Sequence, residues 1–129
     1  MVGDRRTVLI VTDGSKKVAI MAESIAGALQ GKKVQIREAS VFNGTDLLAA
    51  DIILIGCQKA TPDSFDYLDE LLQHVNLAGR SCGIFSPASK KAVQYLAGML
   101  RSSEALLKAE PLLAENSGEI HEWAARVAS

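Results

Sequence analysis

Residues 7–29 join a strand pattern, a polar turn and a helix pattern, and this combination restricts the chain to folds built from βαβ units. Residues 7–11 are β-branched apart from Leu9 and apolar apart from Thr7, which is typical of a strand buried on both faces of a parallel sheet. A six-residue polar turn, residues 12–17, follows. Beyond it, apolar residues recur at the spacing of one helix face: Val18, Met21, Ala22, Ile25, Ala26 and Leu29.

The polar turn lies at the carboxyl end of a strand, where open α/β sheets bind their ligands. The first N–H groups of the following helix have no intrahelical acceptor, and the helix dipole favours an anion beside them. We therefore expect these N–H groups to face outward and to form an anion site. Lys16 and Lys17 either pair with a phosphate dianion there or stay solvated at the tip of the loop.

Two later segments repeat the buried-strand pattern, and two others are partly polar. Residues 51–56 and 82–86 are mostly apolar and predict central strands. Residues 34–39 mix apolar and polar side chains, and the strand predicted within residues 107–114 contains Pro111, which cannot donate to a ladder, so both segments predict sheet edges. These preferences predict a five-stranded parallel sheet in the order 2-1-3-4-5.

Helix patterns fill the segments between the strands. Residues 45–50 predict a short helix after an Asn43-Gly44 turn, and Ser64 and Ser89 are predicted to cap the next two helices. All 129 residues are predicted to form one α/β/α sandwich, with the loops after strands 1, 3 and 4 meeting at one rim. The apolar residues on the inner faces of the later helices are Phe65, Leu68, Leu71, Leu72, Val75, Val93, Leu96, Ala97, Leu100, Ile120, Trp123, Ala124 and Val127.

Charge and cysteine usage narrow the class of protein. A net charge of −1 gives no electrostatic footprint for nucleic acid. No apolar run reaches the roughly 18 residues of a membrane span, and the N-terminus lacks a signal-peptide pattern, so we expect a cytoplasmic protein. We also expect a monomer. Cys57 and Cys82 lie about 16 Å apart along neighbouring predicted strands, which predicts free thiols. His74 and His121 have no Cys, Asp or Glu at the spacing of metal ligands. The sequence also shows no nucleophile and base at a spacing typical of a catalytic pair.

The sequence resembles the flavodoxin family along nearly its whole length. Residues 12–17 resemble the phosphate loop of that family, S/T-x-T-G-N-T, and residues 82–86 resemble its fourth strand. Residues 52–57 followed by residues 62–64 are similar to the third strand and a loop beside the flavin ring, and residues 119–124 resemble the closing helix. The resemblance implies a flavodoxin-like fold and an FMN-based carrier of one or two electrons, a non-catalytic protein rather than an enzyme.

The resemblance also implies a set of cofactor-binding residues. The phosphate loop aligns in two registers, one running from Asp13 to Val18 and the other from Thr12 to Lys17, and the sequence leaves both open. The loops after strands 3 and 4 would flank the flavin ring. The implied residues are Thr12, Asp13, Gly14, Ser15, Lys16, Lys17, Val18, Cys57, Gln58, Lys59, Ala60, Thr61, Ser86, Pro87, Ala88 and Ser89.

The ring-flanking loops favour a second hypothesis. Aromatic side chains usually enclose the flavin ring in this family, but the closest ungapped match places Ala60 and Ala92 there. The loss of both stacking contacts would weaken FMN binding by about 30-fold to 10⁴-fold. Phe65, Tyr67 and Tyr95 lie downstream of these positions as possible replacements. The alternative is a flavodoxin-like binding or regulatory domain that has lost tight FMN binding.

Acidic residues gather on and before the helix that follows strand 3. They are Asp63, Asp66, Asp69 and Glu70. One interpretation is a solvated helix face, because aspartates near a helix N-terminus are favoured by the helix dipole. The other is an acidic docking face for a basic redox partner protein.

Overall fold

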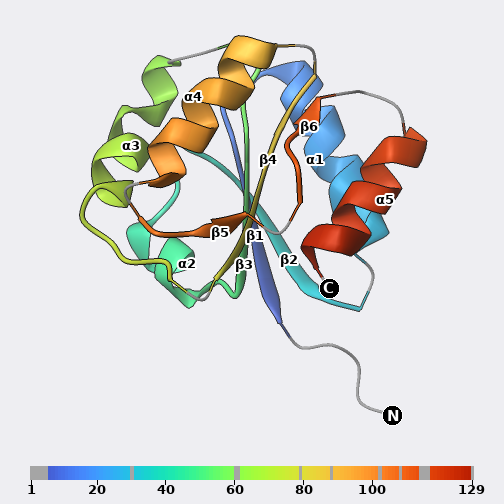
Figure 1. Cartoon of the computed structure of the whole chain (residues 1–129), viewed down its shortest axis with the longest axis horizontal. Helices are drawn as coiled ribbons and strands as arrows, with labels where there is room; N and C mark the ends of the chain where they lie inside the picture. Colours follow the sequence, from blue (N-terminus) through green and yellow to red (C-terminus); the bar gives the residue numbers. More distant parts are fainter. Residues whose placement is uncertain are drawn as a thin grey trace.

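The computed structural model describes residues 6–29, 31–59, 62–78, 80–87, 89–101, 103–107, 109–113 and 117–128. These residues form a sheet with helices on both faces (Figure 1). The strand order is β2-β1-β3-β4-β5, β6 also pairs with β4, and the described pairings are all parallel. The predicted α/β/α architecture and strand order are confirmed. The strands are β1 (Thr7–Thr12), β2 (Lys33–Glu38), β3 (Ile52–Gly56), β4 (Ser81–Ser86), β5 (Leu106–Leu107) and β6 (Leu112–Leu113).

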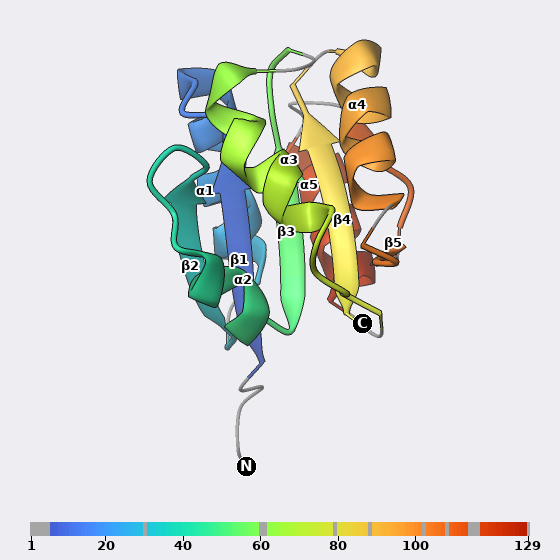
Figure 2. The same ribbon diagram turned by 90° about the vertical axis from the view of Figure 1, so that its left-hand side faces the viewer.

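The helices divide between the two faces of the sheet (Figure 1, Figure 2). One face carries α1 (Lys16–Ala28) and α5 (Ser117–Val127). The other face carries α2 (Gly44–Ala49), α3 (Asp66–Leu72) and α4 (Lys90–Arg101). Within the described residues, no helix has the length and apolar character that crossing a membrane requires.

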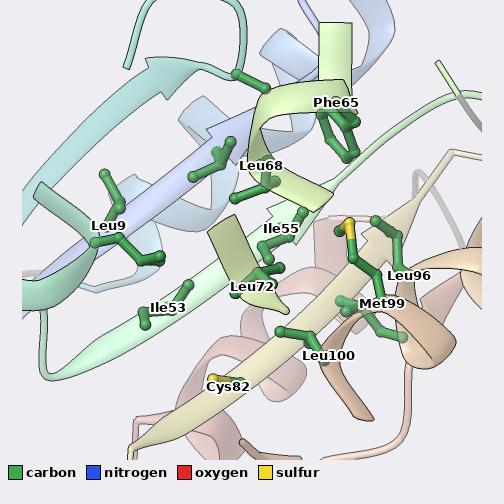
Figure 3. Packing of buried hydrophobic residues seen from close by; sticks show 14 of the residues in the cluster. Leu9, Ile53, Ile55, Phe65, Leu68, Leu72, Cys82, Leu96, Met99 and Leu100 are labelled. Atoms are coloured by element: carbon green, nitrogen blue, oxygen red, sulfur yellow. The ribbon is translucent and has the colours of Figure 1, made fainter. Parts of the chain in front are cut away.

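Each face of the sheet has its own hydrophobic core, because successive side chains of a strand point to opposite faces. Every residue of β3 is buried, whereas β2 at the sheet edge is half-buried or exposed, which accounts for their different compositions. The core under α3 and α4 includes Leu9, Ile53, Phe65, Leu68, Leu72, Leu96 and Leu100 (Figure 3). The core under α1 and α5 includes Ile10, Val18, Ile25, Leu54, Phe85, Ile120 and Trp123.

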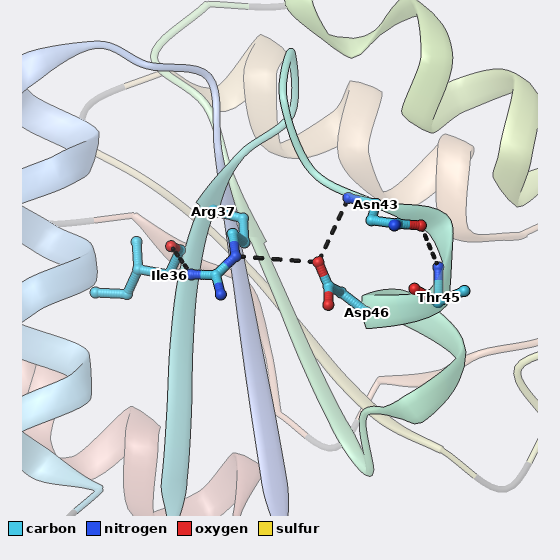
Figure 4. Close-up of polar contacts among 5 residues, drawn as sticks. All are labelled: Ile36, Arg37, Asn43, Thr45 and Asp46. Atoms are coloured by element: carbon cyan, nitrogen blue, oxygen red, sulfur yellow. Dashed lines mark hydrogen bonds and ion pairs between the residues drawn. The ribbon is translucent and has the colours of Figure 1, made fainter.

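Polar contacts hold the start of α2 beside β2 (Figure 4). The Asn43 side chain accepts a hydrogen bond from Thr45 N at 3.0 Å, and Asn43 N donates to Asp46 Oδ2 at 3.4 Å, forming a capping box. Arg37 Nε lies 4.0 Å from the same Asp46 oxygen. The Asn43-Gly44 turn was therefore predicted in the right place but with the wrong role, since Asn43 caps a helix that begins at Gly44.

The predicted N-cap at Ser64 is wrong. Ser64 lies inside a 3₁₀ turn, η1 (Asp63–Phe65), which leads into α3, and neither helix has a side-chain cap. Its hydroxyl instead donates to the carbonyl oxygen of Asp13 at 3.3 Å. The helix pattern is otherwise confirmed over Phe65, Leu68 and Leu72, which are buried, although α3 ends before Val75.

The fifth position of the sheet is filled by two short strands. β5 pairs with Ser81 and Cys82 at the start of β4, and β6 pairs with Phe85 and Ser86 at its end. The edge position is confirmed, but the single strand predicted within residues 107–114 is wrong: Pro111, which has no N–H to donate, belongs to neither short strand and directly precedes β6. Trp123 Nε1 donates to the carbonyl oxygen of Glu110 at 2.9 Å and so ties α5 to this edge.

Candidate functional site

The loops after β1 and β3 meet at the carboxyl edge of the sheet. Figure 2 shows the arrowheads of β1 and β4 at the same end, as parallel pairing requires. The direct link between the two loops is a hydrogen bond from Gln58 N to Asp13 Oδ2 at 2.8 Å. The bond from Ser64 to the Asp13 carbonyl adds a second link. Asp13 therefore joins segments that are more than forty residues apart in the sequence.

The first loop turns on Gly14 and closes around the Asp13 carboxylate. Asp13 Oδ1 accepts a hydrogen bond from Ser15 N at 2.9 Å, while Thr12 Oγ1 accepts a long one from Gly14 N at 3.4 Å. Gly14 has a φ of +86°, which strains any residue with a Cβ. The expectation that the N–H groups of the first loop face outward is wrong for Ser15 N, which already bonds to Asp13. In the second loop, Gln58 N bonds to the same carboxylate.

The N-terminus of α1 keeps groups that can hold an anion. Ser15 is the N-cap residue, yet its side chain makes no capping hydrogen bond. Its Oγ atom is buried and has no hydrogen-bond partner in the described part of the chain. Lys16 and Lys17 are exposed in the first turn of the helix, whereas the Val18 side chain is buried in the core. An uncapped helix N-terminus with an unpaired hydroxyl and two cationic side chains fits a phosphate group.

The second loop begins with a buried thiol. Burial raises the pKa of Cys57 to about 12, and the nearby Asp13 carboxylate contributes to the rise. The thiol therefore stays protonated at neutral pH and is no nucleophile. Cys57 and Cys82 are both free and buried, which confirms the prediction of free thiols. Gln58 and Lys59 are exposed, and the predicted site residues Ala60 and Thr61 lie outside the described residues.

Two serine hydroxyls of the third loop already accept hydrogen bonds from backbone N–H groups. Ser89 N donates to Ser86 Oγ at 3.3 Å, and Ala92 N donates to Ser89 Oγ at 3.1 Å, so Ser89 caps α4 as predicted. Ser86 and Pro87 are buried, and Ala88 lies outside the described residues. The alignment that set Ala92 beside a flavin ring is wrong, because Ala92 lies inside α4 with its side chain in the core.

Aromatic side chains lie close to the second loop. Phe65 is fully buried and stacks against Tyr95 with ring centroids 6.5 Å apart. Burial raises the pKa of the Tyr95 hydroxyl to about 12, with further contributions from nearby groups that include Asp69 and Cys57. Tyr67 is half-exposed and packs against Phe42, 5.5 Å between centroids. Of the three proposed replacement aromatics, Phe65 belongs to the core, while Tyr67 and Tyr95 remain partly accessible.

Solved structures of flavodoxins match this arrangement along nearly the whole chain. Oxidised flavodoxin 2 from Bacillus cereus has a TM-score of 0.84 and 22% identity, over 95% of this chain and 97% of that one. The flavodoxin of Streptococcus pneumonia TIGR4 has a TM-score of 0.84 and 20% identity, over 97% and 98% of the two chains. The chain has the flavodoxin-like fold. No protein-family model matches the sequence, and no curated protein matches it significantly.

A further flavodoxin-like match bears on the candidate site. It is a mutant flavodoxin from Fusobacterium nucleatum, solved bound to flavin mononucleotide, with a TM-score of 0.77 and 8% identity over 95% of both chains. The fold therefore persists where little of the sequence is shared. Whether the loops of this chain can bind a flavin therefore depends on the chemistry of their own residues.

Proposed function

We propose that this protein binds FMN noncovalently at the loops after β1, β3 and β4 and serves as an electron carrier. The proposal is supported by the flavodoxin-like fold and by one local observation, the buried and unpaired Ser15 hydroxyl at the uncapped N-terminus of α1. A buried polar atom without a partner is unfavourable, and a ligand oxygen would give it one. FMN, when bound, supplies the capacity to accept and donate one or two electrons.

The loops divide the binding task between a phosphate end and a ring end. We assign the phosphate to residues 12–18, where the Ser15 hydroxyl donates and Lys16 and Lys17 neutralise charge. We assign the flavin ring to residues 57–61 and 86–89. Tyr95, which is partly exposed and stacks against Phe65 at the end of η1, is the aromatic side chain that we expect beside the ring.

Titration of flavin fluorescence tests the proposal directly. Adding the protein to FMN should quench the fluorescence in a saturable way and shift the absorption spectrum between about 350 and 500 nm, because a ring held against protein groups differs from a solvated one. Absence of quenching up to millimolar concentrations would contradict the proposal. That outcome would instead favour the alternative function, a binding or regulatory domain without tight FMN, which the occupation of two loop N–H groups by Asp13 independently supports.

Replacing Ser15 with alanine should weaken FMN binding without lowering the stability of the ligand-free protein. The ligand-free protein should be unchanged in stability or gain up to about 1 kcal/mol, because no capping bond is lost and an unpaired hydroxyl is removed. FMN affinity should fall about tenfold with the loss of a hydrogen bond to a charged group. Denaturant unfolding and FMN titration measure the two effects. Ser24→Ala, the same change on the exposed face of α1, should leave FMN affinity unaltered; an equal loss there would contradict the assignment.

We further propose that the acidic face, Asp63, Asp66, Asp69 and Glu70, docks a basic redox partner. Asp63, Asp66 and Glu70 are exposed on η1 and α3, which lead directly from the second loop, so a partner there would approach the ring end. Electron transfer from the reduced FMN-loaded protein to a basic c-type cytochrome should slow about tenfold in the Asp63→Asn/Glu70→Gln variant and with added salt. Glu23→Gln, on the opposite face of the sheet, should keep the original rate; equal slowing in both proteins would refute the docking face.

A further inference from the structure

The phosphate loop already contains an anion of its own. The two oxygens of the Asp13 carboxylate accept hydrogen bonds from Ser15 N at 2.9 Å and Gln58 N at 2.8 Å. Backbone N–H groups at such a loop are the donors that a phosphate would use. A phosphate that takes the Ser15 N–H must therefore displace the Asp13 carboxylate and then lie beside it.

A second carboxylate lies against the same loop. Glu38 ends β2, in register with Thr12 at the end of β1. A Cβ built on Gly14 would lie only 2.6 Å from Glu38 Oε1, so the Glu38 carboxylate rests over the turn of the loop. Two negative groups from neighbouring strand ends thus lie at the loop assigned to the phosphate, which also carries the cationic side chains of Lys16 and Lys17.

We propose that Asp13 and Glu38 set the ligand selectivity of this site by penalising a phosphate dianion, which narrows or reverses the preference for FMN over riboflavin. The inference rests on the proposed function, because it assumes that the flavin ring binds at the neighbouring loops. FMN and riboflavin share the ring and differ in the phosphate. Only FMN therefore experiences the repulsion from the two carboxylates, and only FMN competes with Asp13 for the loop N–H groups.

The ratio of the riboflavin and FMN dissociation constants measures this selectivity. Asp13→Asn, Glu38→Gln and the double variant remove one or two negative charges with little change in shape. At low ionic strength each single substitution should raise the ratio about 3-fold to 10-fold in favour of FMN. Glu38→Gln should leave the riboflavin constant itself unchanged, whereas Asp13→Asn also removes one acceptor of the loop hydrogen bonds, so its effect is measured by the ratio alone. Glu104→Gln removes the same charge just before β5, at the opposite edge of the sheet, and should leave the ratio as it is.

Glu38→Gln also distinguishes an effect of charge on flavin selectivity from an effect of losing the hydrogen bonds between the loops. The Glu38 side chain is exposed, and its loss breaks none of the hydrogen bonds that Asp13 makes between the loops. If Asp13 acted only by holding the loops together, Asp13→Asn would weaken FMN and riboflavin alike and Glu38→Gln would have no effect. If both flavins bind but the ratio of the riboflavin and FMN dissociation constants is the same in all variants, the selectivity proposal is overturned. The proposed function would remain intact.

Inorganic phosphate provides a readout that needs no flavin. Phosphate should raise the melting temperature of the Asp13→Asn/Glu38→Gln protein more than that of the original protein, because bound ligand stabilises the folded state. Equal shifts in both proteins would overturn the selectivity proposal. If no variant binds either flavin but the double variant alone responds to phosphate, the proposed function fails and the carboxylates are still shown to exclude the dianion.

Discussion

Replacing Trp123 with alanine should lower the free energy of unfolding by about 3–5 kcal/mol, the usual cost of removing a large buried aromatic side chain. Trp123 is 4% exposed, and its ring meets Phe85 edge-on with centroids 6.0 Å apart and packs on Gly83. Its Nε1 also donates to the Glu110 carbonyl oxygen. The loss would lower the melting temperature by roughly 4 °C per kcal/mol for a chain of this length. Denaturant and thermal unfolding measure it.

Trp123→Phe separates the two contributions of this side chain. Phenylalanine keeps most of the ring contact with Phe85 but removes the donor to Glu110, so the cost should fall to about 1–3 kcal/mol. A Trp123→Phe protein as unstable as Trp123→Ala would mean that the hydrogen bond, rather than the packed ring, carries the stability. A negligible effect of both variants would contradict the placement of α5 over β4.

Replacing Gly56 with alanine should destabilise the protein by about 3 kcal/mol through overpacking. A Cβ at Gly56 would lie 2.2 Å from the ring of Phe85, the residue paired with it on β4. Phe85 is fully buried and its ring also contacts Trp123, so the ring has little room to move away from a new side chain. Equilibrium unfolding in denaturant measures the change, with the slope against denaturant concentration confirming that the folded state stays compact.

Gly98→Ala is the matched control for this substitution. Gly98 lies within the 12 residues of α4, and a Cβ there would meet nothing within 4 Å. The same chemical change should therefore raise stability by about 1 kcal/mol, the difference in helix propensity between glycine and alanine. We therefore expect the free energy of unfolding to fall in Gly56→Ala and to rise in Gly98→Ala. Destabilisation of similar size in both variants would show that the close approach of Gly56 to Phe85 is not the cause of the effect at Gly56.

The candidate site shows where sequence patterns stop being informative. The anion-site prediction depended on a polar turn between a strand and a helix, and the structure does place Ser15 at the N-terminus of α1. The partner of the Asp13 carboxylate was not predictable, because Gln58 belongs to a loop that only the strand order brings close. Ser64 failed as a cap for the same reason, since its hydroxyl bonds across to the first loop. Ala92 was misplaced because an ungapped alignment matches positions without regard to burial, and the Ala92 side chain of α4 lies in the core.

The sequence by itself determined the strand-turn-helix unit of residues 7–29, the separation of central from edge strands and hence the strand order. Those features follow from local periodicity and from the burial that each strand composition demands. Only the tertiary structure decided which loop groups are already bonded, which carboxylates face the phosphate loop, and why Gly56 must lack a side chain. These depend on contacts between residues far apart in the chain, whose geometry is fixed by sheet register and packing rather than by local pattern.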